Sequence, residues 1–378
     1  MITLTCYGGA ETIGGNKLLV EDGGTRFFLD FGTDYELMDC YFEEFLNPRP
    51  ARGLLDYLEM GLLPPLEGLY RSDLEHVEDV WARFRGGASR RKVNLAGKAE
   101  SREVPYEDWR EKGVEGVLLS HAHLDHAGAL AFLRGDIPIH CSPLTAAILK
   151  ANQDTGQSQQ RDEFCYTKER QAKQGVVRAA RGAMPALRPF FLTGQPRNGE
   201  DFNRLWERHP QGELEGTPPG ASPGRIGPFP YRSWPLDHSL MGATAFAVET
   251  SAGWLVYTGD LRQHGRWGQR TRDFLAQAGQ LEPAILLCEG TNAGEGRRVS
   301  EEEVEANCLQ AVKESRGLVV ADFGPRNIER LLVFLRIAQE TGRRLVLLPK
   351  DIWLLEAMRC ASPDTPSPGI PSGLLVCG

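Results

Sequence analysis

Short runs of alternating polar and apolar residues, separated by glycines, open the chain. The run at 2–6 alternates in this way, and β-prone runs follow at 17–21 and 25–30, with an Asp-Gly-Gly turn between the last two. Runs of this length bounded by glycine-containing turns are typical of strands in hairpins. We therefore predict three consecutive strands within residues 1–34.

The middle of the chain carries a second group of apolar runs. Those at 117–119 and 137–141 predict buried strands, and small residues after the first run suit a turn into a helix at 129–134. Residues 244–250 and 253–260 follow a strand, turn and strand pattern. The central part is therefore predicted to be mixed α/β.

The C-terminal part alternates between strand-like and helix-like patterns. An apolar run at 283–289 is followed by a helix start at Ser300, a strand at 317–323, a helix at 328–340 and a strand at 343–348. This alternation predicts a parallel α/β layer. A nucleotide-binding unit would alternate in the same way, but no Gly-rich phosphate-binding motif follows these strands.

Composition narrows the class of protein. The 378 residues exceed one ordinary domain, and 41% hydrophobic with 25% charged residues is usual for a globular protein. The chain has no run of about 18 apolar residues, so no membrane span is predicted. The net charge of −8 gives no general attraction to nucleic acid, so a polyanion would need a local basic groove or bound metal.

The cysteines bear on the compartment. All eight are scattered singly, with no C-x-x-C pair, and no signal peptide is visible at the N-terminus. Scattered cysteines in a long chain fit reduced thiols better than a disulfide framework. We therefore expect a cytoplasmic protein without membrane association.

The densest group of chemically active residues follows the predicted strand at 117–119. His121, His123, Asp125 and His126 lie within six positions. Two residues apart in extended backbone, His121 and His123 point the same way. A histidine-rich surface turn or hydrogen-bonded core histidines would be simpler explanations. Imidazole and carboxylate together are instead the ligands that suit zinc in an open catalytic site, which favours a metal loop.

A second group lies farther along the chain. His238 precedes the predicted strand at 244–250, and Asp260 ends the strand at 253–260 within a Tyr-Thr-Gly-Asp sequence. Either motif alone is weak, but both follow the first group in order and at plausible spacing. His140, beside Cys141, is better explained as part of an ordinary buried strand than as a ligand.

Three stretches resemble a known family. The H-x-H-x-D-H pattern at 121–126 resembles the metal loop of the metallo-β-lactamase fold. Residues 8–16 resemble the G-G-x-x-E-I-G-x-N opening of ribonuclease J-type members, with Thr12 between the Glu and the Ile. Residues 289–293 resemble their E-S-T-N-A segment, with Gly290 in place of Ser. The resemblance covers residues 1–34, 114–149 and 232–350.

The resemblance implies a fold and a domain organisation. We expect an α/β protein, with a metallo-β-lactamase αββα sandwich at 1–294 and the beginning of a β-CASP α/β domain at 295–378. Two stretches, at about 35–112 and 144–227, have no counterpart and are predicted to be insertions. The first of them is a candidate for a lid.

The resemblance also implies metal ligands. One zinc would be held by His121, His123 and His238, a second by Asp125 and His126, and Asp260 would bridge the two. Manganese is an alternative ion. Asp30, at the end of a predicted strand, would brace the metal loop from outside the ligand set. An ordinary turn residue is the alternative for Asp30.

Further residues are assigned to catalysis and to substrate. The catalytic residues would be Asp125, His126 and Glu289. Ser239 and Arg326 would contact substrate. The family carries further histidines downstream, whereas this chain has none after His264. The chain would then be a fragment, or its site would be incomplete.

The implied activity is cleavage of RNA phosphodiester bonds by a water molecule activated by two metal ions. A hydrolase of a small ester or thioester is the alternative within the same fold. A nucleic-acid-binding scaffold without catalysis is a third hypothesis. RNA is therefore the expected partner, and no membrane association is expected. An uncovered edge of the α/β layer could pair with another copy of the chain, so a homo-oligomer is also possible.

Overall fold

The structure is a computed structural model. It describes residues 1–43, 46–75, 79–85, 105–156, 159–209, 212–291, 300–324, 326–363, 365 and 374–376.

A seven-stranded sheet contains the predicted N-terminal strands. Its order is β1-β2-β3-β6-β7-β12-β15. The first three strands pair antiparallel, and the pairs from β3 to β15 are parallel. The strand bounds are β1 Ile2–Gly8, β2 Lys17–Asp22, β3 Thr25–Leu29, β6 Val117–Leu118, β7 Ile139–Cys141, β12 Phe190–Leu192 and β15 Gly220–Ala221. The predicted strands of residues 1–34 are confirmed.

A second sheet of five strands has the order β16-β17-β18-β19-β20. The bounds are β16 Arg225–Ile226, β17 Phe229–Pro235, β18 Thr244–Thr250, β19 Gly253–Tyr257 and β20 Ile285–Leu287. The first four strands form an antiparallel meander, and β20 joins β19 in parallel. Four successive residues of β18 from Ala245 to Val248 are fully buried, as expected for a strand covered on both faces.

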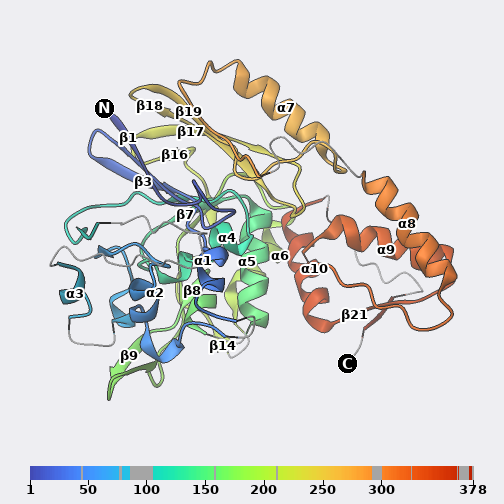
Figure 1. The fold of residues 1–378 in the computed structure, drawn as a ribbon, viewed down its shortest axis with the longest axis horizontal. Coiled ribbons are helices and arrows are strands. Elements are labelled where there is room, and N and C mark those ends of the chain that lie inside the picture. Colours follow the sequence, from blue (N-terminus) through green and yellow to red (C-terminus); the bar gives the residue numbers. More distant parts are fainter. Residues whose placement is uncertain are drawn as a thin grey trace.

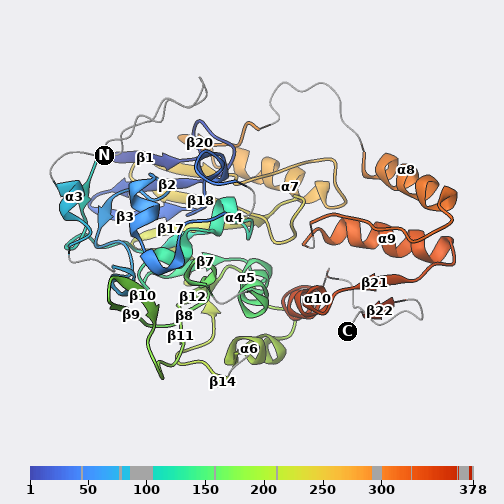
Figure 2. The same cartoon turned by 60° about the horizontal axis from the view of Figure 1, so that its bottom comes forward.

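The two sheets pack face to face, with helices on the outer faces (Figures 1 and 2). Phe27 and Leu118 from the first sheet and Phe246 and Leu255 from the second belong to one buried apolar cluster. Helix α7 (Gly268–Gly279) covers the second sheet through Phe274. Helix α5 (Pro143–Thr155) belongs to the large core cluster on the other side. This is the αββα sandwich that was expected.

The described part of residues 35–112 packs into the large core cluster. Trp81 and Trp109 are 2% and 1% exposed there, and Arg71 forms an ion pair with Glu163 at 2.5 Å. Such burial argues for a fixed layer and against a lid. The elements are α1 Tyr35–Asp39, α2 Leu55–Glu59, β4 Leu66–Glu67, α3 Ala82–Arg85 and β5 Glu107–Asp108, with 3₁₀ turns at Pro50–Arg52 and Ser72–Leu74.

Residues 144–227 contribute both to the sandwich and to a peripheral region. Most of α5, together with β12 and β15, builds the sandwich itself. The peripheral elements are β8 Tyr166–Thr167, β9 Arg170–Lys173, β10 Val176–Ala179, β11 Ala186–Leu187, α6 Gly199–Glu207, β13 Arg208–His209 and β14 Gly212–Glu213, with a 3₁₀ turn at Gln160–Asp162. The short strands pair with one another outside the main sheets.

The C-terminal segment, residues 300–376 as far as described, stands beside the sandwich (Figure 1). Its elements are α8 Glu301–Glu314, α9 Ile328–Glu340, β21 Leu345–Leu347, α10 Pro349–Ala361 and β22 Leu374–Val376. The predicted helix at 328–340 is confirmed, and β21 pairs in parallel with β22. Helix α10 packs on α5 and α6.

Two predictions of local structure are wrong. Residues 317–323 form no strand, because no described strand pairs with them, and Leu318 and Val320 are 91% and 82% exposed. The helix predicted at 129–134 is only a 3₁₀ turn, Leu130–Phe132. The backbone becomes extended at Leu133, since the chain must return to pair β7 with β6.

Candidate metal centre

The metal loop connects β6 to the short helix α4, Leu124–Ala127. His123 lies at the N-cap of this helix in extended backbone, with φ −67° and ψ 144°. Its side chain and that of His121 therefore leave the strand end before the helix starts. Asp125 and His126 then project from the first helical turn. The local sequence thus places four donors around the end of β6.

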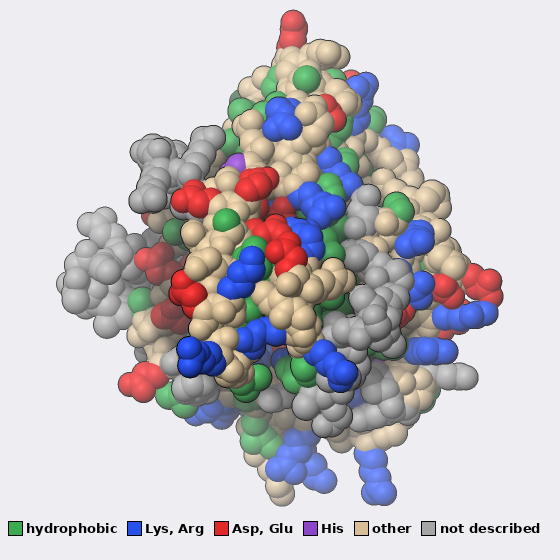
Figure 3. Space-filling view, turned by 90° about the vertical axis from the view of Figure 1, so that its right-hand side faces the viewer, with side chains coloured by type: hydrophobic (Ala, Val, Ile, Leu, Met, Phe, Trp, Pro, Cys, Tyr) green, Lys and Arg blue, Asp and Glu red, His purple; other side chains and the backbone are tan. Residues whose placement is uncertain are grey.

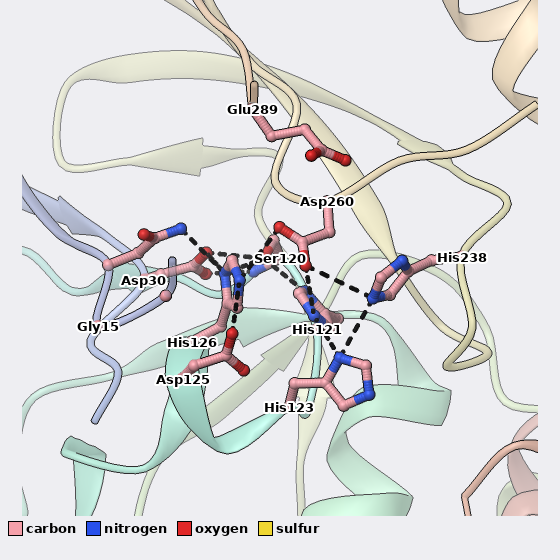
Figure 4. A network of polar contacts seen from close by, with 12 residues as sticks. Gly15, Asp30, Ser120, His121, His123, Asp125, His126, His238, Asp260 and Glu289 are labelled. Carbon is pink, nitrogen blue, oxygen red and sulfur yellow. Dashed lines mark hydrogen bonds and ion pairs between the residues drawn. The ribbon is translucent and has the colours of Figure 1, made fainter. Parts of the chain in front are cut away.

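The first donor group consists of His121, His123, His238 and Asp260, whose ligand atoms all lie within 4.8 Å of one another. Nδ1 of His123 lies 3.0 Å from Nε2 of His121 and 3.1 Å from Nε2 of His238. Oδ2 of Asp260 is 3.5 Å from Nε2 of His238. Figure 4 shows these side chains pointing at one another from β6, the loop after β17 and the end of β19.

The second donor group consists of Asp125, His126 and Asp260. Nε2 of His126 lies 3.2 Å from Oδ1 of Asp260 and 3.7 Å from Oδ2 of Asp125. The two oxygens of Asp260 therefore face different groups, Oδ1 the second and Oδ2 the first. A carboxylate in this position can bridge two cations.

Asp30 holds the metal loop from behind. Its carboxylate is fully buried and accepts hydrogen bonds from the Ser120 backbone N–H at 2.6 Å and the Ser120 hydroxyl at 2.7 Å. It also accepts from the Tyr257 hydroxyl at 2.5 Å and pairs with Nδ1 of His126 at 2.7 Å. Asp30 thereby holds the Nδ1 side of the His126 ring, so Nε2, which faces Asp260, is the nitrogen that would bind an ion. Asp30 therefore contacts the metal loop at Ser120 and His126, and its bracing role stays a prediction.

Burial controls the charge of the donors. It lowers the pKa of His121 well below its usual range and the pKa values of His123 and His238 to about 4. These imidazoles are therefore neutral, which is the form that binds metal. Burial also opposes charge on His126, but the Asp30 and Asp260 carboxylates outweigh it and raise its pKa to about 10.

Two glycines allow the backbone to approach Asp125. A Cβ on Gly14, whose φ is +78°, would lie 2.5 Å from Cβ of Asp125, and one on Gly32 would overlap the Asp125 carbonyl. The backbone N–H of Gly15 donates to that carbonyl at 2.9 Å. Asn16 lies beside Nδ1 of His126 at 3.3 Å. The glycine-rich opening of the chain therefore supports the second donor group.

The other predicted site residues lie around these groups. Glu289 accepts a hydrogen bond from the Leu261 backbone N–H at 2.9 Å and lies beside Asp260, outside both donor groups (Figure 4). The Ser239 hydroxyl is 3.5 Å from Nε2 of His238. Nη1 of Arg326 donates to the Ala122 carbonyl at 3.2 Å, between His121 and His123.

Sequence reasoning assigned no role to Ser120, Tyr257 or Arg262, although the first two bond Asp30 directly. For Ser120 and Tyr257, the only sequence feature that could have indicated a role was their position next to a predicted ligand or its strand. Ser120 immediately precedes His121, and Tyr257 ends the strand that leads to Asp260.

The donor set fits a divalent cation. Neutral imidazole nitrogens about 3 Å apart direct lone pairs at one another unless a proton or a cation lies between them, as at His121, His123 and His238. Imidazoles with carboxylates are the ligands expected for zinc, and each histidine of the metal loop that is buried has its second nitrogen hydrogen-bonded. His264 is exposed and belongs to neither group.

Comparison with known proteins agrees with this geometry. A family model described as a beta-lactamase superfamily domain matches residues 91–183, which include the metal loop. A crystal structure of a protein of unknown function from Enterococcus faecalis superposes with a TM-score of 0.56 at 23% identity, covering 94% of this chain and 67% of that one. The chain has the metallo-β-lactamase fold, as predicted.

Curated relatives narrow the resemblance further. Ribonuclease J of Sinorhizobium meliloti is 23% identical over 268 residues, which are 66% of this chain and 38% of that protein. Ribonuclease J of Mycobacterium tuberculosis is 26% identical over 246 residues, or 63% of this chain and 35% of that protein. The chain is thus similar to ribonucleases J in sequence, and its match spans little more than a third of the length of those relatives.

The two donor groups lie in the part of the fold that contains the metal loop matched by the superfamily model, together with the loops of His238 and Asp260. The assignment of residues 295–378 to the beginning of a β-CASP domain stays a prediction. Across the described ranges, no helix has both the length and the apolar character needed to cross a membrane.

Proposed function

We propose that the protein hydrolyses RNA phosphodiester bonds with two divalent ions, zinc or alternatively manganese, held by the two donor groups. The observation that carries the proposal is the position of Asp260, with one oxygen facing each group. When bound, a pair of ions supplies Lewis acidity for the phosphoryl group and for the attacking water. His121, His123 and His238 would hold the first ion, Asp125 and His126 the second, and Asp260 both.

Asp125 is the residue proposed to orient the attacking water. Burial raises the pKa of its carboxyl, whereas neighbouring His126 lowers it. Its Oδ2 faces Nε2 of His126, and its main chain is fixed by Gly15. A carboxylate held at the edge of the donor group can accept a proton from water. Glu289, by contrast, is proposed to act by holding the loop after Asp260 through Leu261.

Arg326 is the proposed contact for substrate phosphate. Its guanidinium lies beside the metal loop, and its hydrogen bond with Ala122 uses one of its five donors. No ion pair with a carboxylate is seen for it within the described residues. Acidic and basic side chains lie intermixed on the face of the C-terminal segment (Figure 3), so among its described residues that face offers no continuous basic surface. A polyanion would therefore be recognised mainly beside the metal loop, where Arg326 lies.

The test is a comparison of substrates under defined metal. The chain, loaded with zinc or manganese, is assayed on single-stranded RNA and on a thioester and a lactam. We expect cleavage of RNA that is lost in a His121→Ala/His123→Ala double variant. His264→Ala is the matched control, because that histidine is exposed and lies outside both donor groups.

Two results would contradict the proposal. Efficient hydrolysis of the thioester or lactam with intact RNA would favour the small ester or thioester hydrolase. Equal metal content in the wild type and the double variant would show that the histidines do not hold the ions.

A further inference from the structure

Helix α9 of the C-terminal segment reaches the two loops that carry His238 and Asp260. We infer that Arg262 is a positioning residue that fixes His238 and Asp260 relative to each other. Glu329 of α9 in turn holds the Arg262 guanidinium in place. The inference rests on the proposed metal centre. It adds that docking of the C-terminal segment controls how tightly the first ion is held.

Asp237 joins the two ligand-bearing loops. It immediately precedes His238 and is fully buried. Its carboxylate lies 3.2 Å from Nη2 of Arg262 and accepts from the Gly265 backbone N–H at 2.9 Å. Its carbonyl accepts from the Arg262 backbone N–H at 2.9 Å. The residue before one ligand is therefore bound, through side chain and main chain, to the residue two positions after another.

Glu329 holds the same guanidinium from the other side. Its carboxylate pairs with Nη2 of Arg262 and accepts from the Arg266 backbone N–H at 2.5 Å. The side chains of Arg262 and Glu329 are 12% and 8% exposed. Glu301, at the start of α8, lies 3.9 Å from Nη1 of Arg262 and pairs with Arg330 at 3.0 Å. Both helices therefore converge on one arginine.

The arrangement has little freedom to move. Two largely buried carboxylates, Asp237 and Glu329, share the guanidinium of Arg262. Removing that guanidinium would take the shared cationic partner from two buried negative charges, which is destabilising. A Cβ added to Gly265 would overlap the guanidinium, so the loop also packs directly on Arg262. A planar fork with several fixed donors suits this bridging, whereas a lysine offers a single charged centre.

A second ion pair between α8 and α9 provides a matched control. Arg336 pairs with Glu305 on the exposed side of the two helices. Within the described residues, neither Arg336 nor Glu305 forms a hydrogen bond or ion pair with Asp237 or Arg262. Loss of Arg336 should therefore affect the helix pair and leave the metal centre as it is.

The experiment measures zinc affinity by competition with a chromophoric chelator, with zinc alone as the probe and no substrate. Compared are the wild type, Arg262→Gln, Arg262→Lys, Glu329→Gln and the control Arg336→Gln. We expect Arg262→Gln to weaken the tighter zinc site by roughly 10–100-fold, as for other residues that hold ligands in place. Arg262→Lys should recover part of the loss, and Arg336→Gln should bind as the wild type does.

The outcomes separate the two proposals. If the wild type binds no zinc, the metal centre itself is wrong and the inference fails with it. If the wild type binds zinc and folded Arg262→Gln binds it equally well, only the positioning role is refuted. Should Arg262→Gln fail to fold, Glu329→Gln and Gly265→Ala decide, because both disturb the guanidinium while keeping it. Unchanged zinc affinity in both would refute the inference.

Discussion

Replacing Asp30 tests whether the metal loop depends on a residue that would touch no ion. Four hydrogen bonds converge on this buried carboxylate, from Ser120 twice, from Tyr257 and from His126. Its φ is +56°, a conformation that asparagine tolerates better than alanine. Asp30→Asn therefore keeps the backbone and the size of the side chain and changes only the acceptors.

The magnitude follows from the hydrogen bonds. Oδ1 accepts from the Ser120 N–H, and the other three donors meet Oδ2. With the amide oxygen at the Oδ2 position, the amide NH₂ would face the Ser120 N–H. One unpaired buried donor costs about 1–3 kcal/mol of stability. Asp30→Ala would lose all four bonds, about 4 kcal/mol at ~1 kcal/mol each, from a typical total of about 5–15 kcal/mol.

Metal affinity distinguishes bracing from general stabilisation. With His126 no longer held by a carboxylate, we expect Asp30→Asn to lower metal affinity by roughly 10–100-fold. The matched control is Asp22→Asn, since Asp22 is 2% exposed and accepts two hydrogen bonds from Ser251 instead of from the metal loop. Urea unfolding and zinc competition would be measured for both variants. Equal metal affinity in Asp30→Asn and Asp22→Asn would refute the bracing role.

Other predictions concern charge, substrate and association. Burial lowers the pKa of Lys17 from its ordinary 10.5 to about 8, a difference of about 3 kcal/mol. The unfolded chain therefore binds the extra proton between these values, and wild-type stability should rise from pH 8 to 10.5. Urea unfolding of Lys17→Met should show greater stability at pH 7 and loss of that rise. An unchanged pH profile would show that burying the Lys17 charge does not destabilise the fold. Arg326→Gln should weaken RNA binding and reduce its salt dependence, measured by fluorescence anisotropy, while Arg326→Lys retains part of both; equal salt slopes would remove Arg326 from the phosphate site. Exposed Leu318 and Val320 border a cavity of about 660 Å³, so Leu318→Lys/Val320→Lys should reduce any self-association seen by sedimentation, and an unchanged association state would place the contact elsewhere.

Local sequence determined the parts of the fold that depend on neighbouring residues. The alternation at 2–6 and the β-prone runs at 17–21 and 25–30, with a glycine-containing turn between the last two, predicted β1 to β3, because these signals lie in neighbouring residues. The helix at 328–340 was predicted at its observed bounds for the same reason. His121, His123, Asp125 and His126 could be grouped from spacing alone, since one strand end and one helical turn hold them.

Tertiary structure decided what depends on distant partners. Residues 317–323 have the composition of a strand and form none, because a strand also needs a neighbour with which to pair. Spacing did not show that the two oxygens of Asp260 face different donor groups. Nor did it show that Arg262 lies between Asp237 and Glu329, which are 92 residues apart in the chain. These contacts arise only when separate strands and helices pack, and no local pattern encodes the direction in which a long side chain then points.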